Sequence, residues 1–421
     1  MNRKYRKTGS VLTSLVLAVS MAGCGGAAVD GPSSAASAAG TSTTSQQALD
    51  GNFDRFDLER FTRKIWEGDT VYFETICFME QEDGSIVSGT LLYAPDKILS
   101  VRSHNLQTVY EEGKDYTISG NRLVRTENSR IPVFPLSEYR EPTNGNNAWL
   151  KITGTDQSLR VNGAGRLVYQ VAVCYTHSDG WKGIRPESQI DSLPKTAAKL
   201  ANKEKLKLAF YGDSITVGME ASGQNETLMN PDTMTETEMI SGRSPYTPAW
   251  PEIVTKKLQS VYGYTGITRV NRAIGGTTSV WGKQNADKLV NPEKPDLTVI
   301  AFGMNEAVSS GEAFRANIEE IMDTIHAKNP DTEFLLVSCM MPNCDAETFA
   351  QNRLKEQEEA LYAIQKERTD LAVGVVPVHS MFLSMQELGK RHTDYSGNNV
   401  NHPNDFGVIV YAQMILNALG C

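Results

Sequence analysis

The feature that most constrains the fold is an alternation of short apolar runs with longer amphipathic segments from residue 206 to the C-terminus. Five of the runs have the length and composition of buried strands: Leu206–Tyr211, Ile267–Asn271, Leu297–Phe302, Phe334–Ser338 and Val373–Val378. Strands that alternate with helices are typical of a parallel sheet covered by helices on both faces. The sequence therefore predicts an α/β domain with three layers over residues 200–421.

The segments between these runs have helical features. Apolar residues recur at spacings of four, three and four at Phe314, Ile318, Ile321 and Ile325, so they share one helical face. We expect further helices at Pro251–Tyr262, Glu347–Lys366 and Phe406–Leu419, with Asp405 as the N-cap of the last one.

Residues 51–195 have a different pattern, in which short β-like runs are separated by turn signals. The runs are Val71–Met79, Gly89–Tyr93, Ile98–Val101, Asp115–Ile118, Arg122–Val124, Ala148–Ile152 and Arg166–Tyr175. Many short strands at this spacing predict an all-β domain resembling a sandwich or jelly roll. This domain could be a sugar-binding module or a structural companion of the α/β domain.

The first 24 residues have the features of a signal peptide. A basic start, Arg3 to Lys7, precedes the apolar stretch Val11–Val19, which is too short to span a bilayer. Ser20-Met21-Ala22-Gly23-Cys24 resembles a bacterial lipobox, with Met21 where Leu is usual. We expect lipid on Cys24 and a flexible tether, rich in Ser, Ala, Gly and Thr, over residues 25–50. The expected location is outside the bacterial cytoplasmic membrane, either anchored as a lipoprotein or secreted.

Five cysteines follow the lipobox. Cys77 could pair with Cys174, and Cys339 with Cys344, but free thiols fit the sequence at least as well. The spacing of Cys339 and Cys344 does not predict a metal site, because no pair of histidines accompanies them. The net charge of −9 gives no reason to expect a nucleic-acid partner.

Polar and glycine-rich segments follow three of the predicted strands, and a fourth lies near the C-terminus. They are Gly212–Gly218, Asn271–Thr278, Gly303–Glu306 and Asn399–Asp405. Ligands of parallel sheets bind beyond the carboxyl ends of the strands. The four segments are therefore expected to meet at one edge of the sheet.

These segments, in this order, resemble the signature blocks of the SGNH (GDSL) hydrolase family over about half of the chain. The resemblance implies that Ser214 is the nucleophile of an ester hydrolase and that His402 is its general base. It also implies an oxyanion hole formed by the backbone N–H of Ser214 with Gly276 and Asn305. No cofactor and no metal ion are implied.

The chemistry of the residues agrees with these roles. A hydroxyl is a poor nucleophile near neutral pH and needs an adjacent base, and an imidazole titrates in the useful range. Negative charge develops on the carbonyl oxygen during acyl transfer. A closely approaching glycine N–H and an asparagine amide are suitable donors, each worth about 3 kcal/mol of the barrier.

Two positions depart from the family pattern. Asn399 occupies the place of the aspartate that orients the histidine in other members, and Glu306 replaces an aspartate that follows the block III asparagine. Asn399, Asp394 or a backbone carbonyl could orient His402; we favour Asn399 or a carbonyl, the latter giving a Ser–His dyad. Loss of the charge should lower activity without abolishing it.

The sequence predicts a carboxylic ester hydrolase that removes acetyl or other short acyl groups, most simply from a polysaccharide. A lipase on longer acyl chains and a non-catalytic glycan-binding surface protein are the alternatives. The polar insertion Met219–Trp250 could shape a sugar cleft through Tyr246 and Trp250, or Trp250 could pack beneath the next helix. Arg272 could contact a polar substrate or pair with Glu306.

Overall fold

The structure, a computed structural model, describes residues 57–161, 163–224, 227–229, 236–239, 242–306, 309–349 and 353–421. Among these residues, none of the helices is long and apolar enough to cross a membrane. Cys24, the proposed signal peptide and the tether lie outside the described residues. The described part belongs to one compact unit that spans residues 44–421.

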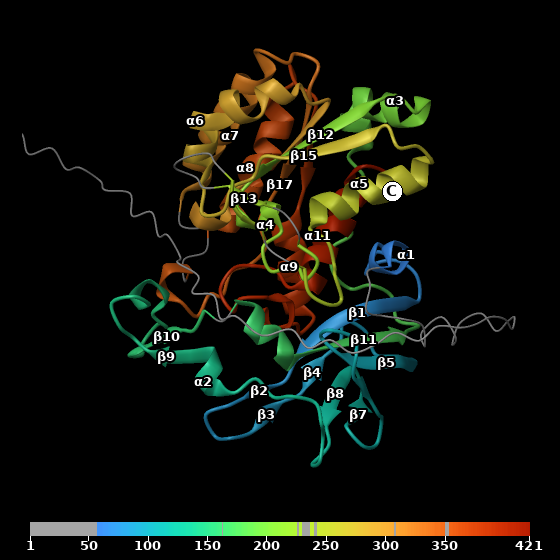
Figure 1. Cartoon of the computed structure of the whole chain (residues 1–421), viewed down its shortest axis with the longest axis vertical. Helices are drawn as coiled ribbons and strands as arrows, with labels where there is room; N and C mark the ends of the chain where they lie inside the picture. Colours follow the sequence, from blue (N-terminus) through green and yellow to red (C-terminus); the bar gives the residue numbers. More distant parts are fainter. Residues whose placement is uncertain are drawn as a thin grey trace, which may run out of the picture. The chain divides into compact units, whose positions relative to one another are not determined.

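The C-terminal half contains a five-stranded parallel sheet with the order β15-β12-β16-β17-β18 (Figure 1). The strands are β12 (Leu206–Gly212), β15 (Ile267–Asn271), β16 (Leu297–Ala301), β17 (Glu333–Val337) and β18 (Val373–Val376). All five predicted strands are therefore present. The most N-terminal strand, β12, lies inside the sheet, so the segment that follows it emerges near the middle of the sheet edge.

Helices cover both faces of this sheet and give the predicted three layers. They are α3 (Pro194–Asn202), α5 (Trp250–Tyr262), α6 (Ser279–Leu289), α7 (Gly311–His326), α8 (Leu354–Glu367), α9 (Val378–Glu387) and α11 (Asp405–Ala418). Leu208 and Phe210 of β12 belong to the apolar core that includes α5, α9 and α11. Ala209 and Tyr211 belong to the core beneath α6, α7 and α8. Alternate residues of one strand thus face opposite helical layers.

Short elements complete this half: α4 (Ser214–Val217), β13 (Thr227–Met229), β14 (Glu236–Met239), η4 (Asn291–Glu293), η5 (Met304–Glu306), η6 (Glu347–Phe349) and α10 (His392–Tyr395). Two sequence expectations need correction. The segment expected as one helix from Glu347 consists of η6 and then α8. The N-cap of α11 is Asn404, whose side chain accepts a hydrogen bond from Gly407 N, and Asp405 is the first helical residue.

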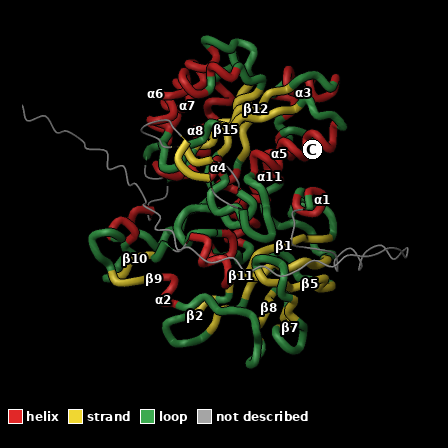
Figure 2. The backbone as a smooth tube through the Cα atoms, viewed as in Figure 1, coloured by secondary structure: helices red, strands yellow, loops and turns green. Residues whose placement is uncertain are grey.

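The N-terminal region is mostly β, as predicted, and Figure 2 shows its strands and long loops. Its elements are α1 (Leu58–Phe61), β1 (Thr70–Cys77), β2 (Met79–Glu80), β3 (Ile86–Val87), β4 (Gly89–Thr90), β5 (Lys97–Ser103), β6 (Val109–Tyr110), β7 (Tyr116–Ser119), β8 (Arg122–Arg125), α2 (Leu136–Tyr139), β9 (Arg140–Pro142), η1 (Ala148–Leu150), β10 (Gln157–Leu159), η2 (Gly163–Tyr169), β11 (Gln170–Thr176) and η3 (Ile190–Ser192). A four-stranded sheet, β1-β11-β5-β6, lies beside a three-stranded one, β4-β8-β7, and two hairpins.

Two strand predictions in this region are wrong in part. Ala148–Leu150 forms a 3-10 turn, which follows an asparagine-rich turn where Asn144 N donates to Asn147 Oδ1 at 2.6 Å. The run that begins at Arg166 is helical as far as Tyr169 and becomes a strand only at Gln170. Neither proposed disulfide is present, since Cys77, Cys174 and Cys339 have free thiols.

Helix α11 joins the two halves of the molecule. Every residue from Phe406 to Ala418 is buried, so the helix is covered all round. Gln413 Nε2 donates to the carbonyl oxygens of Phe61 and Arg63 at 3.1 and 2.6 Å. The N-terminal region therefore covers the side of α11 that faces away from the parallel sheet.

Candidate active site

Ser214 lies where the sequence predicts, directly after the inner strand β12 and at the first position of the short helix α4. Asp213 caps this helix, and its Oδ1 accepts a hydrogen bond from Ile215 N at 3.0 Å. The turn requires glycine at position 212, because the Cβ of any other residue would lie 2.3 Å from the carbonyl oxygen of Ala301 on β16, which is too close. The sharp turn thus depends on close packing between two neighbouring strands.

His402 meets Ser214 across 188 positions of sequence, and its Nε2 lies 2.9 Å from Ser214 Oγ. His402 belongs to the segment of residues 393–404, which begins within α10 and is named the base loop. Although the residue keeps part of its surface open to solvent, burial of the ring lowers the pKa of His402 to about 4. The imidazole is therefore neutral at pH 7 and able to accept the proton of the hydroxyl.

Gly276 and Asn305, the two other residues of the predicted site, lie in the segments that follow β15 and β16. Gly276 has φ 75°, a left-handed conformation that favours glycine, and a Cβ there would meet no atom within 4 Å. Asn305 Nδ2 donates to the carbonyl oxygen of Thr277 at 2.8 Å, which links block III to block II and leaves the second amide hydrogen. Within the described part of the chain, the N–H groups of Ser214 and Gly276 have no acceptor.

Two side chains of the same α/β half hold α4 in place. Trp250 Nε1 donates to Ile215 O at 2.9 Å, and Asn271 Nδ2 donates to Thr216 O at 3.0 Å. Trp250 is fully buried, so it packs at the start of α5 and offers no face to a substrate. Tyr246 of the same insertion is 48% exposed.

Asn399 does not bind His402. Its Nδ2 donates to the carbonyl oxygens of Tyr139 and Arg160, at 2.9 and 3.3 Å, both in the N-terminal region. Asn399 has φ 69°, which asparagine tolerates better than most residues. The amide that replaces the family's aspartate therefore ties the base loop to the β region and does not hold the imidazole.

The other two candidates for the orienting group, Asp394 and a backbone carbonyl, do not bind the imidazole of His402 either. Asp394 accepts hydrogen bonds from Cys77 N and Arg391 N, both at 2.8 Å. Among the described residues, no side chain or carbonyl accepts a hydrogen bond from His402 Nδ1. Ser214 and His402 thus form a hydrogen-bonded pair, and no third residue is hydrogen-bonded to the imidazole among those described.

Arg272 and Glu306 do not pair with each other. Arg272 forms an ion pair with Glu293 on the outer side of the sheet edge. Glu306 is buried, and its carboxylate accepts hydrogen bonds from Ser279 N and Ser279 Oγ at 2.8 and 2.7 Å. The longer side chain that departs from the family pattern therefore caps the start of α6.

Sequence reasoning missed the residues that hold the base loop. Asn398 Oδ1 accepts hydrogen bonds from three backbone N–H groups, including that of His402 at 3.0 Å. Arg166 and Gln170, from the β region, donate to carbonyl oxygens of the same loop. In the sequence, Arg166 is only the first residue of the β-like run Arg166–Tyr175. No cluster of three or more metal-ligating side chains occurs among the residues described.

The three layers and the Ser214–His402 contact are features of a serine hydrolase domain. Residues 210–408 match the GDSL-like Lipase/Acylhydrolase family. These residues, a little under half of the chain, therefore form a GDSL-like lipase/acylhydrolase domain.

Comparison with curated proteins finds no match. Solved structures that resemble the chain include a two-domain esterase active on acetylated mannans, co-crystallised with mannopentaose (19% identity, TM-score 0.39, 55% of this chain). The match spans about half of that esterase, 54%. Others are a catalytic mutant of an acetylxylan esterase from Geobacillus stearothermophilus (19%, 0.39, 51% of this chain and 94% of that one) and a putative GDSL-like lipase from Parabacteroides merdae (17%, 0.38, 51% and 96%).

Proposed function

We propose that this protein is an exported serine esterase that removes acetyl or other short acyl groups from a polysaccharide. The observation that carries the proposal is the 2.9 Å contact between His402 Nε2 and Ser214 Oγ. A hydroxyl that is hydrogen-bonded to a neutral imidazole is the arrangement that nucleophilic acyl transfer requires.

In the first half-reaction, Ser214 Oγ attacks the carbonyl carbon of the ester as its proton passes to His402 Nε2. The N–H groups of Ser214 and Gly276, with the free amide hydrogen of Asn305, would donate to the resulting oxyanion. When the tetrahedral intermediate collapses, His402 returns the proton to the departing sugar oxygen. The products of this step are an alcohol and an acyl group on Ser214.

In the second half-reaction, His402 removes a proton from water, and the hydroxide attacks the acyl carbon. The second intermediate collapses with return of the proton to Ser214 Oγ, which releases the carboxylic acid. Every proton in the two half-reactions passes through His402, so the proposed mechanism needs no further acid or base.

A short acyl group suits the surroundings of the nucleophile. Ser214 is only 3% exposed, and a Cβ on the adjacent Gly275 would lie 3.7 Å from Ser214 Cβ. The backbone of Gly275 therefore comes close to the Ser214 side chain on that side, which favours a small acyl substituent. Asn398 and Asn401, hydrogen-bonded to each other at 3.0 Å beside His402, give this part of the base loop a polar character that suits a carbohydrate.

Hydrolysis of p-nitrophenyl esters tests the proposal. Ser214→Ala should lower acetate release by about 1,000-fold or more, because the nucleophile is lost. Wild-type rates should fall from acetate to octanoate esters. Equal rates for wild type and Ser214→Ala would overturn the esterase assignment in favour of a glycan-binding role. A preference for octanoate would support a lipase instead.

Release of acetate from acetylated polysaccharides then identifies the natural substrate class. We expect acetate from at least one acetylated xylan or mannan with wild type and none with Ser214→Ala. Acetate release from p-nitrophenyl acetate but from no acetylated polysaccharide would contradict the carbohydrate part of the proposal.

Export and lipid anchoring form the second part of the proposal, and the sequence Arg3 to Cys24 supports it. In cells that express the full chain, the protein should fractionate with the membrane. Cys24→Ala should release it, because the lipid-bearing thiol is lost. An unchanged membrane fraction for Cys24→Ala would contradict lipidation at this residue.

A further inference from the structure

We propose that Arg166 and Gln170 of the β region are positioning residues for His402. On this inference, the N-terminal region sets the position of the general base through the backbone of the base loop, in place of a carboxylate on the imidazole. The inference rests on the proposed function, since it assigns a role in the same Ser–His chemistry.

Arg166 is the most unusual side chain of the β region. It is completely buried, and within the described part of the chain no carboxylate forms an ion pair with it; Asp394, the carboxylate of the base loop, pairs with Arg391 at 3.7 Å. Its guanidinium instead donates to the carbonyl oxygens of Ser396 and Thr393, at 3.2 and 3.1 Å. The ring of Phe134 lies beneath it, 4.8 Å from its central carbon. Burying a charge is costly unless hydrogen bonds or an ion pair compensate for the lost water, so these bonds to the base loop should be strongly favoured.

Gln170 binds the same two carbonyl oxygens. Its Nε2 donates to Ser396 O at 2.8 Å and to Thr393 O at 3.1 Å. Its Oε1 accepts from Asn404 Nδ2 at 2.9 Å, at the far end of the base loop. Two neighbouring side chains of η2 and β11 therefore hold the beginning, the middle and the end of the loop.

Ser396 is linked directly to the backbone on either side of His402. It pairs with Pro403 in an isolated β-bridge, and the next residue, Gly397, donates its N–H to His402 O at 2.8 Å. A shift of the carbonyl oxygen at Ser396 would therefore be transmitted to the backbone of His402. The imidazole has no orienting hydrogen bond of its own at Nδ1, so its position depends on this backbone.

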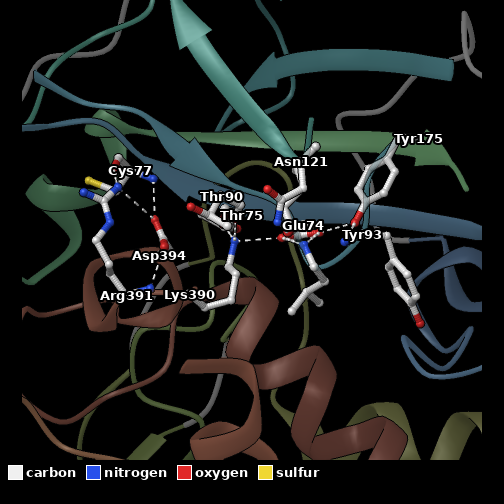
Figure 3. Close-up of polar contacts among 12 residues, drawn as sticks. Glu74, Thr75, Cys77, Thr90, Tyr93, Asn121, Tyr175, Lys390, Arg391 and Asp394 are labelled. Carbon is white, nitrogen blue, oxygen red and sulfur yellow. Dashed lines mark hydrogen bonds and ion pairs between the residues drawn. The ribbon is translucent and has the colours of Figure 1, made fainter. Parts of the chain in front are cut away.

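The segment that leads into the base loop is anchored in β1, as Figure 3 shows. Lys390 Nζ lies 2.8 Å from Glu74 Oε1, and both side chains are fully buried. Tyr175 OH donates to the same carboxylate at 2.6 Å. Four residues further on, Asp394 accepts from Cys77 N, and Arg391 donates to Cys77 O. These contacts fix the N-terminal end of the loop against the β region.

Two substitutions test the inference in the full chain: Arg166→Met and Gln170→Leu, which remove the donors and keep most of the volume. For p-nitrophenyl acetate, kcat should fall about 10- to 100-fold with a smaller change in KM, because a misplaced base acts mainly in the transition state. The loss should shrink as the pH rises, since hydroxide then replaces the misplaced base. Arg166→Lys should recover part of kcat.

Arg125→Met is the matched control. Arg125 also donates to carbonyl oxygens, those of Ile131 and Ser129, but entirely within the β region. Its kcat should equal that of wild type. Thermal melts measure the folded fraction, and rates are expressed per folded molecule. Because Gln170→Leu removes no charge, it keeps the test decisive if Arg166→Met does not fold.

Values of kcat within twofold of wild type for folded Arg166→Met and Gln170→Leu would overturn the inference. So would a loss that is equal at every pH, which would indicate general damage and not a displaced base. Failure of the proposed function is a separate result: Ser214→Ala would then keep wild-type activity, whatever the two positioning variants do.

Discussion

The proposed nucleophile and the proposed base of this site are held by two different kinds of support. Ser214 is placed by its own α/β half: the end of β12, the cap from Asp213 and the hydrogen bond from Trp250 to Ile215. His402 belongs to the same half by sequence, but its loop is bound by the side chains of Arg166 and Gln170 from the β region. Within one site, therefore, Ser214 depends on a local turn and His402 depends on a long-range interface.

The two supports also differ in the kind of interaction. The turn at Ser214 depends on close backbone packing and on neighbours that are near in sequence or in adjacent strands. The base loop depends on buried polar side chains, which are costly to desolvate and specific once satisfied. Damage to the interface should therefore affect His402 and leave the turn at Ser214 intact.

The largest effect is expected from breaking the ion pair between Lys390 and Glu74, which anchors the segment before the base loop to β1. Lys390→Met leaves the carboxylate of Glu74 buried without its cation, which should lower the free energy of unfolding by about 3 to 5 kcal/mol. Lys114→Met is the control, because Lys114 and Glu111 form an exposed pair, each side chain 58% exposed. It should change the free energy by less than about 1 kcal/mol. Urea unfolding measures both, and equal losses would contradict the comparison.

A smaller effect is expected at Asn399. Asn399→Asp restores the family's residue, but it places carboxylate oxygens against the carbonyl oxygens of Tyr139 and Arg160, which now accept hydrogen bonds. The free energy of unfolding should fall by about 2 to 3 kcal/mol, and kcat should not rise.

Asn398→Asp provides the contrast for this prediction. Asn398 uses its oxygen to accept three N–H groups, so an aspartate can keep those bonds. Its stability should stay within about 1 kcal/mol of wild type. A more active Asn399→Asp enzyme would show that the side chain can turn toward the imidazole, and would break the distinction between the two supports.

The smallest effects per step of the experiment are the pH dependences of stability, which should be opposite for the two residues of the site. Burial raises the pKa of Asp213 to about 7, so the folded state holds a proton that the unfolded state has lost. The unfolding free energy therefore falls as pH rises from about 4 to 7. Burial lowers the pKa of His402 to about 4, against 6.5 when unfolded. Its contribution therefore rises over about pH 4 to 6.5.

Urea unfolding from pH 4.5 to 7.5 separates these contributions. The stability of Asp213→Asn relative to wild type should increase with pH, by up to about 1 kcal/mol per pH unit. The stability of His402→Gln relative to wild type should decrease with pH over the same range. Slopes of the same sign for the two variants would show that the titrations assigned to the two residues are wrong.

The α/β half was predictable because its signals are local. Each strand is a short apolar run, and the blocks with Ser214, Gly276 and Asn305 each follow such a run, so their common place at one sheet edge follows from the topology of a parallel sheet. Boundaries were less certain, since Asn404 and Asp405 are both good caps and only the hydrogen bond to Gly407 distinguishes them.

The support of His402 was not predictable, because its partners are far apart in sequence. Arg166 and Ser396 are separated by 230 positions, and no periodicity relates them. Asn399 stands where the family has its orienting aspartate, which suggested a contact with the imidazole. The carbonyl oxygens of Tyr139 and Arg160 compete for the same amide, and backbone acceptors leave no mark in a sequence.

The complete burial of α11 has a practical consequence for anyone who wishes to produce the two halves separately. A fragment that begins near residue 200 would leave one side of this helix, including Phe406 and Ile409, uncovered in water. Such apolar surface promotes aggregation and makes a protein sensitive to proteases. The soluble, minimal enzyme therefore has to include the β region, and a truncation series should lose solubility before it loses the catalytic residues.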